Sequence, residues 1–449
     1  MTLRFTTLLA LAITCSISDA SVLPPIPVAT VKDTLARPIH IIRYNATIEP
    51  NFAEHSISGS VTIVVASLKD GLKEFDLDCN ELQISEVYDQ RQPLKYELRD
   101  SHLHIELAHP IQRTEWVTLS MHYYGTPHTG IFFNAERSEV FTSFSTSHWM
   151  PCIDAPDDRA TLELNIILPR SLQVVACGRL KSKSVDSRHR TIYQWKLDTP
   201  APSYTYGFCA GKFSTATATV DSVKLNYLSA KYSGDRLGTI FVETPAMVKF
   251  FEEKSDMPYQ GEQYSQALLH DAAPQEMSGF AVMDEDYGQE VLNNNHEVWL
   301  IAHELAHQWW GNMVTCQNWT HMWLNEGMAT FMVAAFKEKR FGKADYDREI
   351  NLFRTRYERV RDAGKDKSLV FPDWDHPTKE DRTIVYQKGA YVLYLLRTEL
   401  GDADFWKGIK YYTKTYWGQS VTTHDFQTVM ETATGKKLDL FFSKWVYMK

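Results

Sequence analysis

The stretch His303-Glu304-Leu305-Ala306-His307 says most about what this chain folds into and does. Residues at i and i+4 of a helix lie on the same face, so both imidazoles can reach one cation. A third ligand can come from Glu326, within Trp323-Leu324-Asn325-Glu326-Gly327 on a following helix. Three protein ligands leave one corner of a zinc tetrahedron open for water, which is typical of a catalytic site. The pattern therefore predicts one Zn²⁺ ion held by His303, His307 and Glu326.

Glu304 lies between the two histidines and is expected to turn toward the open corner of the predicted site. Zinc lowers the pKa of a bound water to about 7, and a neighbouring glutamate can accept its proton as a carbonyl is attacked. A helix over 297–310 is supported by an apolar stripe of Val298, Ile301, Leu305 and Trp309. We therefore predict a zinc hydrolase in which Glu304 is the general base.

Length and composition indicate how many domains to expect and which partners are excluded. A chain of 449 residues is too long for one ordinary core, so two or more domains are expected. The net charge of −9, without a block of lysine or arginine, argues against nucleic acid or an anionic membrane as a partner. Beyond residue 20 no apolar stretch approaches the ~20 residues of a membrane helix, so no membrane span is expected.

The first twenty residues are predicted to be a signal peptide. Arg4 gives a short basic region, residues 8–17 are apolar, and Ser18-Asp19-Ala20 offers small residues for cleavage. The alternative is a buried N-terminal helix. Residues 21–36 form a proline-containing lead-in segment. We expect the mature protein to be exported, either to the periplasm or out of the cell.

The remaining chain predicts an α+β protein of two domains. Residues 37–213 contain short runs with period-two alternation, which indicates an antiparallel β-sheet domain with one buried face. Examples of these runs are 57–65, 102–107 and 161–168. Residues 214–449 form the predicted catalytic domain, which has helical spacing over most of its length. Its expected helices span 238–254, 297–310, 321–339, 346–363, 387–400, 402–417 and 423–434.

The zinc segment also carries a family resemblance. The HExxH motif, the eighteen-residue spacing to Glu326, and Trp309-Trp310-Gly311-Asn312 together resemble the M1 family of zinc aminopeptidases, which includes aminopeptidase N and leukotriene A4 hydrolase. Residues 151–157, 385–390 and 441–445 resemble further segments of that family. The resemblance covers about residues 37–449 and implies a short two-domain bacterial type. It further implies a thermolysin-like catalytic domain of the gluzincin class.

The resemblance implies a role for Tyr386, within Val385-Tyr386-Gln387-Lys388-Gly389. In the family this tyrosine donates a hydrogen bond to the oxyanion of the tetrahedral intermediate. The alternative is a tyrosine that merely packs at a helix start.

The group that binds the substrate's free α-amine departs from the family pattern. Family members use a glutamate in a Gly-x-Met-Glu-Asn motif before the zinc helix, whereas this chain has Gly279-Phe280-Ala281-Val282-Met283-Asp284-Glu285. By that resemblance we favour Glu285 as the amine anchor, with Asp284 close behind; the alternative is a solvated acidic loop. The β-domain segment Ser143-Phe144-Ser145-Thr146 lacks the carboxylate or amide that usually assists.

The leading hypothesis is an exported zinc aminopeptidase that acts on peptides with a free N-terminus. A zinc oligopeptidase or an epoxide hydrolase on the same scaffold is the enzymatic alternative. A non-catalytic, zinc-stabilised binding protein is the third, although it predicts loss of Glu304 or Tyr386, and both are present. Neither the oligomeric state nor the side-chain preference follows from the sequence.

Overall fold

The computed structural model describes residues 37–90, 92–372, 374 and 377–448. The predicted signal peptide (1–20) and lead-in segment (21–36) lie outside these residues. From Pro38 onward the chain forms one compact unit. Within the described ranges, no helix combines the length and apolarity needed to cross a lipid bilayer.

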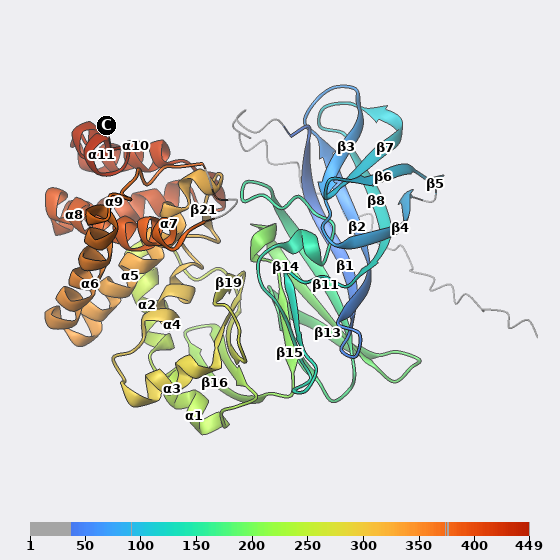
Figure 1. Ribbon diagram of the computed structural model, residues 1–449, viewed down its shortest axis with the longest axis horizontal. Helices are drawn as coiled ribbons and strands as arrows, with labels where there is room; N and C mark the ends of the chain where they lie inside the picture. Colours follow the sequence, from blue (N-terminus) through green and yellow to red (C-terminus); the bar gives the residue numbers. More distant parts are fainter. Residues whose placement is uncertain (1–36, 91, 373, 375–376, 449) are drawn as a thin grey trace, which may run out of the picture. The chain divides into compact units, whose positions relative to one another are not determined.

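Antiparallel strands with alternating burial build the N-terminal part of the chain (Figure 1). In β11 (Arg159–Leu168) every second side chain is buried, as the sequence predicts. The largest sheet in the described residues has the order β13-β14-β11-β1-β2-β8-β4-β5. Its only parallel pair in this part of the chain joins β1 to β11, where the prediction was wholly antiparallel. Besides β11, its strands are β1 (Ile39–Asn51), β2 (Ser56–Ser67), β4 (Leu82–Asp89), β5 (Gln92–Pro93), β8 (Trp116–Gly125), β13 (Arg179–Val185) and β14 (Thr191–Pro202).

Two smaller sheets complete the β-rich part that the structure describes. One has the order β3-β7-β6, with bounds Leu72–Asp78, His102–Ile111 and Lys95–Arg99. The other has the order β12-β15-β10-β9, with bounds Gln173–Ala176, Phe208–Gly211, Glu139–Thr142 and Ile131–Asn134. Inward-facing side chains of all three sheets share one apolar core.

A further sheet, which the sequence did not lead us to expect, begins the C-terminal part. Its order is β16-β17-β18-β20-β19, with bounds Ser214–Val220, Val223–Ser229, Gln263–Leu269, Phe280–Asp284 and Gln275–Met277. Strands β18 and β20 are buried on both faces, so they lack the period-two alternation that reveals a half-exposed strand. Ala267 and Val282 face the β-domain core, while Leu268 and Ala281 face the helical core. One face of this sheet therefore packs in the β-domain core and the other in the helical core.

Helices form the rest of the C-terminal part (Figure 1). The expected helix 238–254 is instead two, α1 (Gly234–Ile240) and α2 (Thr244–Ser255), because Pro245 starts a new helix. Helices α5, α6, α8 and α9 pack against one another, and α10 coincides with its prediction. The remaining helices are α3 (Glu285–Asn293), α4 (Trp299–Ala306), α5 (Trp323–Phe341), α6 (Lys343–Asp362), α7 (Lys379–Thr383), α8 (Gly389–Leu400), α9 (Asp402–Thr415), α10 (Thr423–Thr434) and α11 (Asp439–Trp445), and β21 (Val314–Cys316) pairs with β22 (Gln419–Val421).

Candidate active site

Helices α4 and α5 bring His303, His307 and Glu326 together. His303 lies in α4, His307 caps its C-terminal end, and Glu326 lies in the first turn of α5. The two histidine Nε2 atoms are 3.1 Å apart, and they lie 3.2 and 3.5 Å from Glu326 Oε2. All three side chains are buried. The part of the chain that the structure describes contains no other such group of three potential ligands.

These three atoms fit a zinc ion. Ligands about 2.0–2.1 Å from a tetrahedral centre are about 3.4 Å from one another, close to the spacing here. His307 Nδ1 lies 3.0 Å from the carbonyl oxygen of Trp310 and donates to it, which leaves the Nε2 lone pair facing His303 and Glu326. Three electron-rich atoms that converge in this way favour a cation among them.

Gly311 allows the chain to turn back closely over His307. Its φ of +140° is one that side chains rarely adopt, and a Cβ there would lie 2.7 Å from His307 Nδ1. The Trp310 carbonyl that orients His307 therefore depends on a glycine at the next position.

Three buried carboxylates, those of Glu276, Glu304 and Glu326, give the site a strongly negative potential. Burial alone would lower the pKa of His307, but Glu276 and Glu326 outweigh it and raise that pKa to about 10. Burial would raise the pKa of Glu326, but His307 and hydrogen bonds from both histidines hold it well below its usual range. The site therefore favours added positive charge, which again suits a metal ion.

Glu304 is placed as a proton acceptor. It lies in α4 between the two histidines, and burial raises its pKa well above the usual range despite the opposing charge of His307. Its Oε2 atom is buried and has no hydrogen-bond partner among the described residues. A carboxylate with a raised pKa and a free oxygen can take up a proton beside the ligand group.

Tyr386 stands over the first histidine. Its ring stacks on His303 at 5.7 Å between centroids, with the planes 17° apart. Burial, with Glu326 next, raises its pKa well above the usual value, so the phenol keeps the proton that it would donate. The tyrosine lies in a π-helical turn, Ile384–Lys388, where the sequence predicted only a helix starting at 387. Such turns are rare and are frequent at functional sites.

Two glycines allow α5 and α8 to approach closely beside the site. A Cβ on Gly327 would lie 3.0 Å from Gly389 Cα and 3.1 Å from the Val385 carbonyl oxygen. Because Gly327 follows Glu326 and Val385 precedes Tyr386, this contact sets how near the tyrosine lies to the metal-ligand group.

Gly327→Ala is therefore expected to lower the free energy of unfolding by about 1–3 kcal/mol, the usual range for overpacking. Gly238→Ala is the matched control, because a Cβ there meets nothing within 4 Å and its helix is exposed on that side. Urea denaturation of both variants measures the difference. A Gly327→Ala protein as stable as Gly238→Ala would show that the helices can separate at no cost.

The structure does not bring the two predicted amine anchors to this group. Asp284 ends β20 and caps α3, where its side chain accepts from the Asp286 N–H. Both carboxylate oxygens of Glu285 accept from Arg137 at 2.8 Å. Burial would raise the pKa of Glu285, but the hydrogen bonds from Arg137 leave it below its usual value. Glu285 is thus neutralised by the β-domain rather than offered to a ligand.

Sequence reasoning missed Glu276, a buried carboxylate whose charge acts on the site. It lies in β19 and is 4% exposed, and its charge acts on His307, Glu304 and Tyr386. Burial raises its pKa to about 7, with Glu326 adding to the shift and His307 opposing it. The Gly-x-Met-Glu-Asn pattern does not point to Glu276, because this residue precedes Met277 instead of following a methionine. A carboxylate three residues before Gly279, ahead of the zinc helix, was the available signal.

Of the aromatic and histidine residues near the candidate site, three tryptophans pack in the helical core and a fourth lies beside His303. Trp309, Trp310 and Trp323 are fully buried in the helical core. Trp299 is different, because it is 41% exposed and its ring lies 5.8 Å from that of His303. His296 and His321 pair with Asp345 and Thr423 and take no part in the ligand group.

Comparisons with known proteins give family matches over most of the chain. Residues 40–205 match the peptidase M1 N-terminal domain, and residues 241–445 match the peptidase family M1 domain. Aminopeptidase N of Lactococcus lactis is 27% identical over 440 residues, which are 90% of this chain and 50% of that protein. Leucine aminopeptidase 2 of Aspergillus fumigatus is 26% identical over 84% of this chain and 65% of its own length. This chain thus spans between half and two thirds of these two relatives.

Solved structures show the same fold. An M1 zinc metallopeptidase from Deinococcus radiodurans superposes with a TM-score of 0.78 at 24% identity, covering 92% of this chain and 94% of that one. Native yeast LTA4 hydrolase gives a TM-score of 0.79 at 22% identity, covering 91% of this chain and 68% of that one.

Proposed function

Because this chain belongs to peptidase family M1, we propose that it is a zinc-dependent aminopeptidase that removes N-terminal residues from peptides. The observation that carries the proposal is the convergence of His303, His307 and Glu326, with Glu304, Tyr386 and Glu276 around them. Each of the roles below is inferred from position, charge and hydrogen-bonding capacity.

The proposed metal ligands are His303 Nε2, His307 Nε2 and Glu326 Oε2. When bound, zinc supplies a Lewis acid that polarises a carbonyl and makes water acidic. The chain's own contribution begins with the Trp310 carbonyl, which holds the His307 ring in one tautomer.

Glu304 and Tyr386 are the proposed catalytic residues. Glu304 takes a proton from the attacking water and passes it to the leaving amine, which its raised pKa favours. Tyr386 remains a neutral phenol and donates to the oxygen that becomes negative as the carbonyl carbon turns tetrahedral.

Glu276 replaces Glu285 and Asp284 as the proposed anchor of the substrate's amine. Its pKa of about 7 leaves it able to ionise, and an ammonium group beside it would lower that pKa further. Buried carboxylates bind ammonium groups strongly when both are desolvated. An anchor next to the metal ligands restricts cleavage to the first peptide bond.

Glu276→Gln is expected to raise KM for an amino-acid arylamide by about tenfold or more, since a charge-assisted hydrogen bond contributes roughly 1.5–3 kcal/mol. The N-acetylated substrate, which lacks the amine, should stay uncleaved by both the wild type and the variant. Glu285→Gln is the matched control, and because Glu285 already pairs with Arg137, it should leave KM unchanged. The reverse result, a raised KM for Glu285→Gln alone, would restore Glu285 as the anchor.

Acetylated substrates also distinguish an aminopeptidase from the two alternative enzymes. An oligopeptidase on the same scaffold would cleave blocked and free peptides at similar rates, and an epoxide hydrolase would cleave neither.

We also propose that residues 1–20 direct export, so the N-terminal sequence of the mature protein should start at Ser21.

A further inference from the structure

We propose that Gln308 is a positioning residue that fixes the amine anchor Glu276 relative to the metal-binding histidines. The residue directly follows His307, and its side chain is buried. Its Nε2 donates to the Met277 carbonyl at 3.0 Å, and its Oε1 accepts from the Gly279 N–H at 3.0 Å. One amide thus bonds a carbonyl and an N–H two residues apart, as a neighbouring strand would. We call this pair of bonds the Gln308 clamp.

The clamp acts at an edge of the five-stranded sheet. Strand β19 is only three residues long, and in the described residues it pairs with β20 alone. A short edge strand has free backbone groups on its outer side and little to hold it in place. Gln308, on the segment that carries His307, satisfies the carbonyl of Met277 in β19 and the N–H of Gly279 in the turn that follows the strand. The metal ligand and the anchor strand are therefore joined by one buried side chain.

Asn312 extends the connection. Its Nδ2 donates to the carbonyl of Glu276 itself at 3.3 Å. Its backbone carbonyl accepts from buried Arg159, on β11 of the β-domain, at 2.7 Å. The turn after α4 thus bonds to β19 at residues 276 and 277 and to the turn that follows the strand at residue 279, and Arg159 of the β-domain bonds to it in turn.

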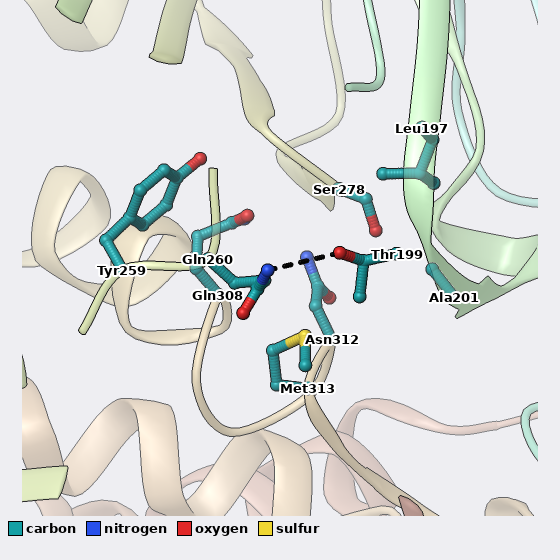
Figure 2. Close-up of a pocket in the computed structure, with 9 residues that line it drawn as sticks. All are labelled: Leu197, Thr199, Ala201, Tyr259, Gln260, Ser278, Gln308, Asn312 and Met313. Atoms are coloured by element: carbon teal, nitrogen blue, oxygen red, sulfur yellow. Dashed lines mark hydrogen bonds between the residues drawn. The ribbon is translucent and has the colours of Figure 1, made fainter. Parts of the chain in front are cut away.

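A small pocket lies against the clamp. Figure 2 shows Gln308 and Asn312 facing Leu197, Thr199 and Ala201 of β14 across it. Its volume of about 20 Å³ has room for roughly one water molecule and excludes a peptide. Asn312 Oδ1 is buried without a hydrogen-bond partner among the described residues, so a water there would have a group to bind. The pocket serves the support of β19 and not the substrate.

The proposal rests on the role of Glu276 proposed above and adds how its position is set. A substrate's amine and its scissile carbonyl are a fixed covalent distance apart, so discrimination for free N-termini requires a fixed distance from Glu276 to the metal. Releasing β19 should weaken amine recognition while leaving the metal in place.

The test measures binding, so that it does not depend on turnover. The parent is Glu304→Gln protein loaded with zinc, titrated calorimetrically with Leu-Gly-Gly and with N-acetyl-Leu-Gly-Gly. Gln308→Met keeps the length of the side chain and removes both bonds of the clamp. Its affinity for the free peptide should fall about tenfold, as expected when the charge-assisted bond from the peptide's amine to a displaced Glu276 is weakened. Its affinity for the acetylated peptide and its zinc content should not change.

Gln427→Met is the control, because Gln427 is also buried and also makes two side-chain hydrogen bonds, to Glu431 and Asp439. Should Gln308→Met fail to fold, Gln308→Glu decides, since it keeps an acceptor for Gly279 and loses the donor to Met277. A free-to-acetylated affinity ratio that matches the parent would overturn the clamp, as would loss of zinc with both affinities falling together. Equal affinities in the parent would overturn the proposed function and the clamp with it.

Discussion

Glu304→Gln should lower kcat by about a thousandfold while leaving one zinc per chain, because glutamine fills the same space but cannot accept a proton. Glu304 Oε2 has no hydrogen-bond partner among the described residues, so the substitution breaks no hydrogen bond of that atom there. The raised pKa of Glu304 marks it as the group poised to take up a proton beside the ligand set. Steady-state hydrolysis of a leucine arylamide, with zinc measured by plasma emission, gives both quantities.

Glu253→Gln, at an exposed position of α2, is the control for this substitution and should match the wild type. Wild-type turnover in Glu304→Gln would remove Glu304 from the mechanism. A parallel loss of zinc would instead make Glu304 part of what holds the metal.

Tyr386→Phe should lower kcat by about 10²–10³-fold with little change in KM, as removal of one oxyanion donor does in other hydrolases. The phenol's bond forms mainly in the transition state, whereas the ring's stacking on His303 is kept by phenylalanine. Thermal stability and zinc content should therefore stay close to the wild type.

Tyr391→Phe, five residues further on in α8, tests whether any tyrosine of this region would have the same effect. It stacks on Tyr394 away from the ligand group and should leave kcat unchanged. If Tyr386→Phe raised KM instead and left kcat intact, the phenol would bind the ground state and not the oxyanion.

The grouping of His303, His307 and Glu326 could be predicted from sequence because helical geometry is local. The i, i+4 spacing of His303 and His307 needs only one helix, and α4 provides it up to Ala306. The β-domain was also predictable, since strands such as β11 have one exposed face and so alternate. The mixed sheet was missed because β18 and β20 are buried on both faces.

The amine anchor depends on contacts that no local pattern reveals. Glu285 keeps the residue type that the motif suggests, yet Arg137, 148 positions earlier, takes up both its oxygens. Glu276 comes to the site only because β19 lies at the edge of a sheet and beside the turn after α4. The π-helical turn that carries Tyr386 likewise lies where Gly327 and Gly389, 62 positions apart, bring α5 and α8 close together, a contact that no local pattern reveals.

Metal dependence on a free-amine substrate is the most direct test of the central claim. Hydrolysis of leucine arylamide and of N-acetyl-leucine arylamide would be measured before dialysis against a chelator, after it, and after one equivalent of zinc is restored. We predict that only the free-amine substrate is cleaved, that dialysis abolishes its cleavage, and that zinc restores it. Equal cleavage of both substrates, or activity that survives removal of the metal, would contradict the account.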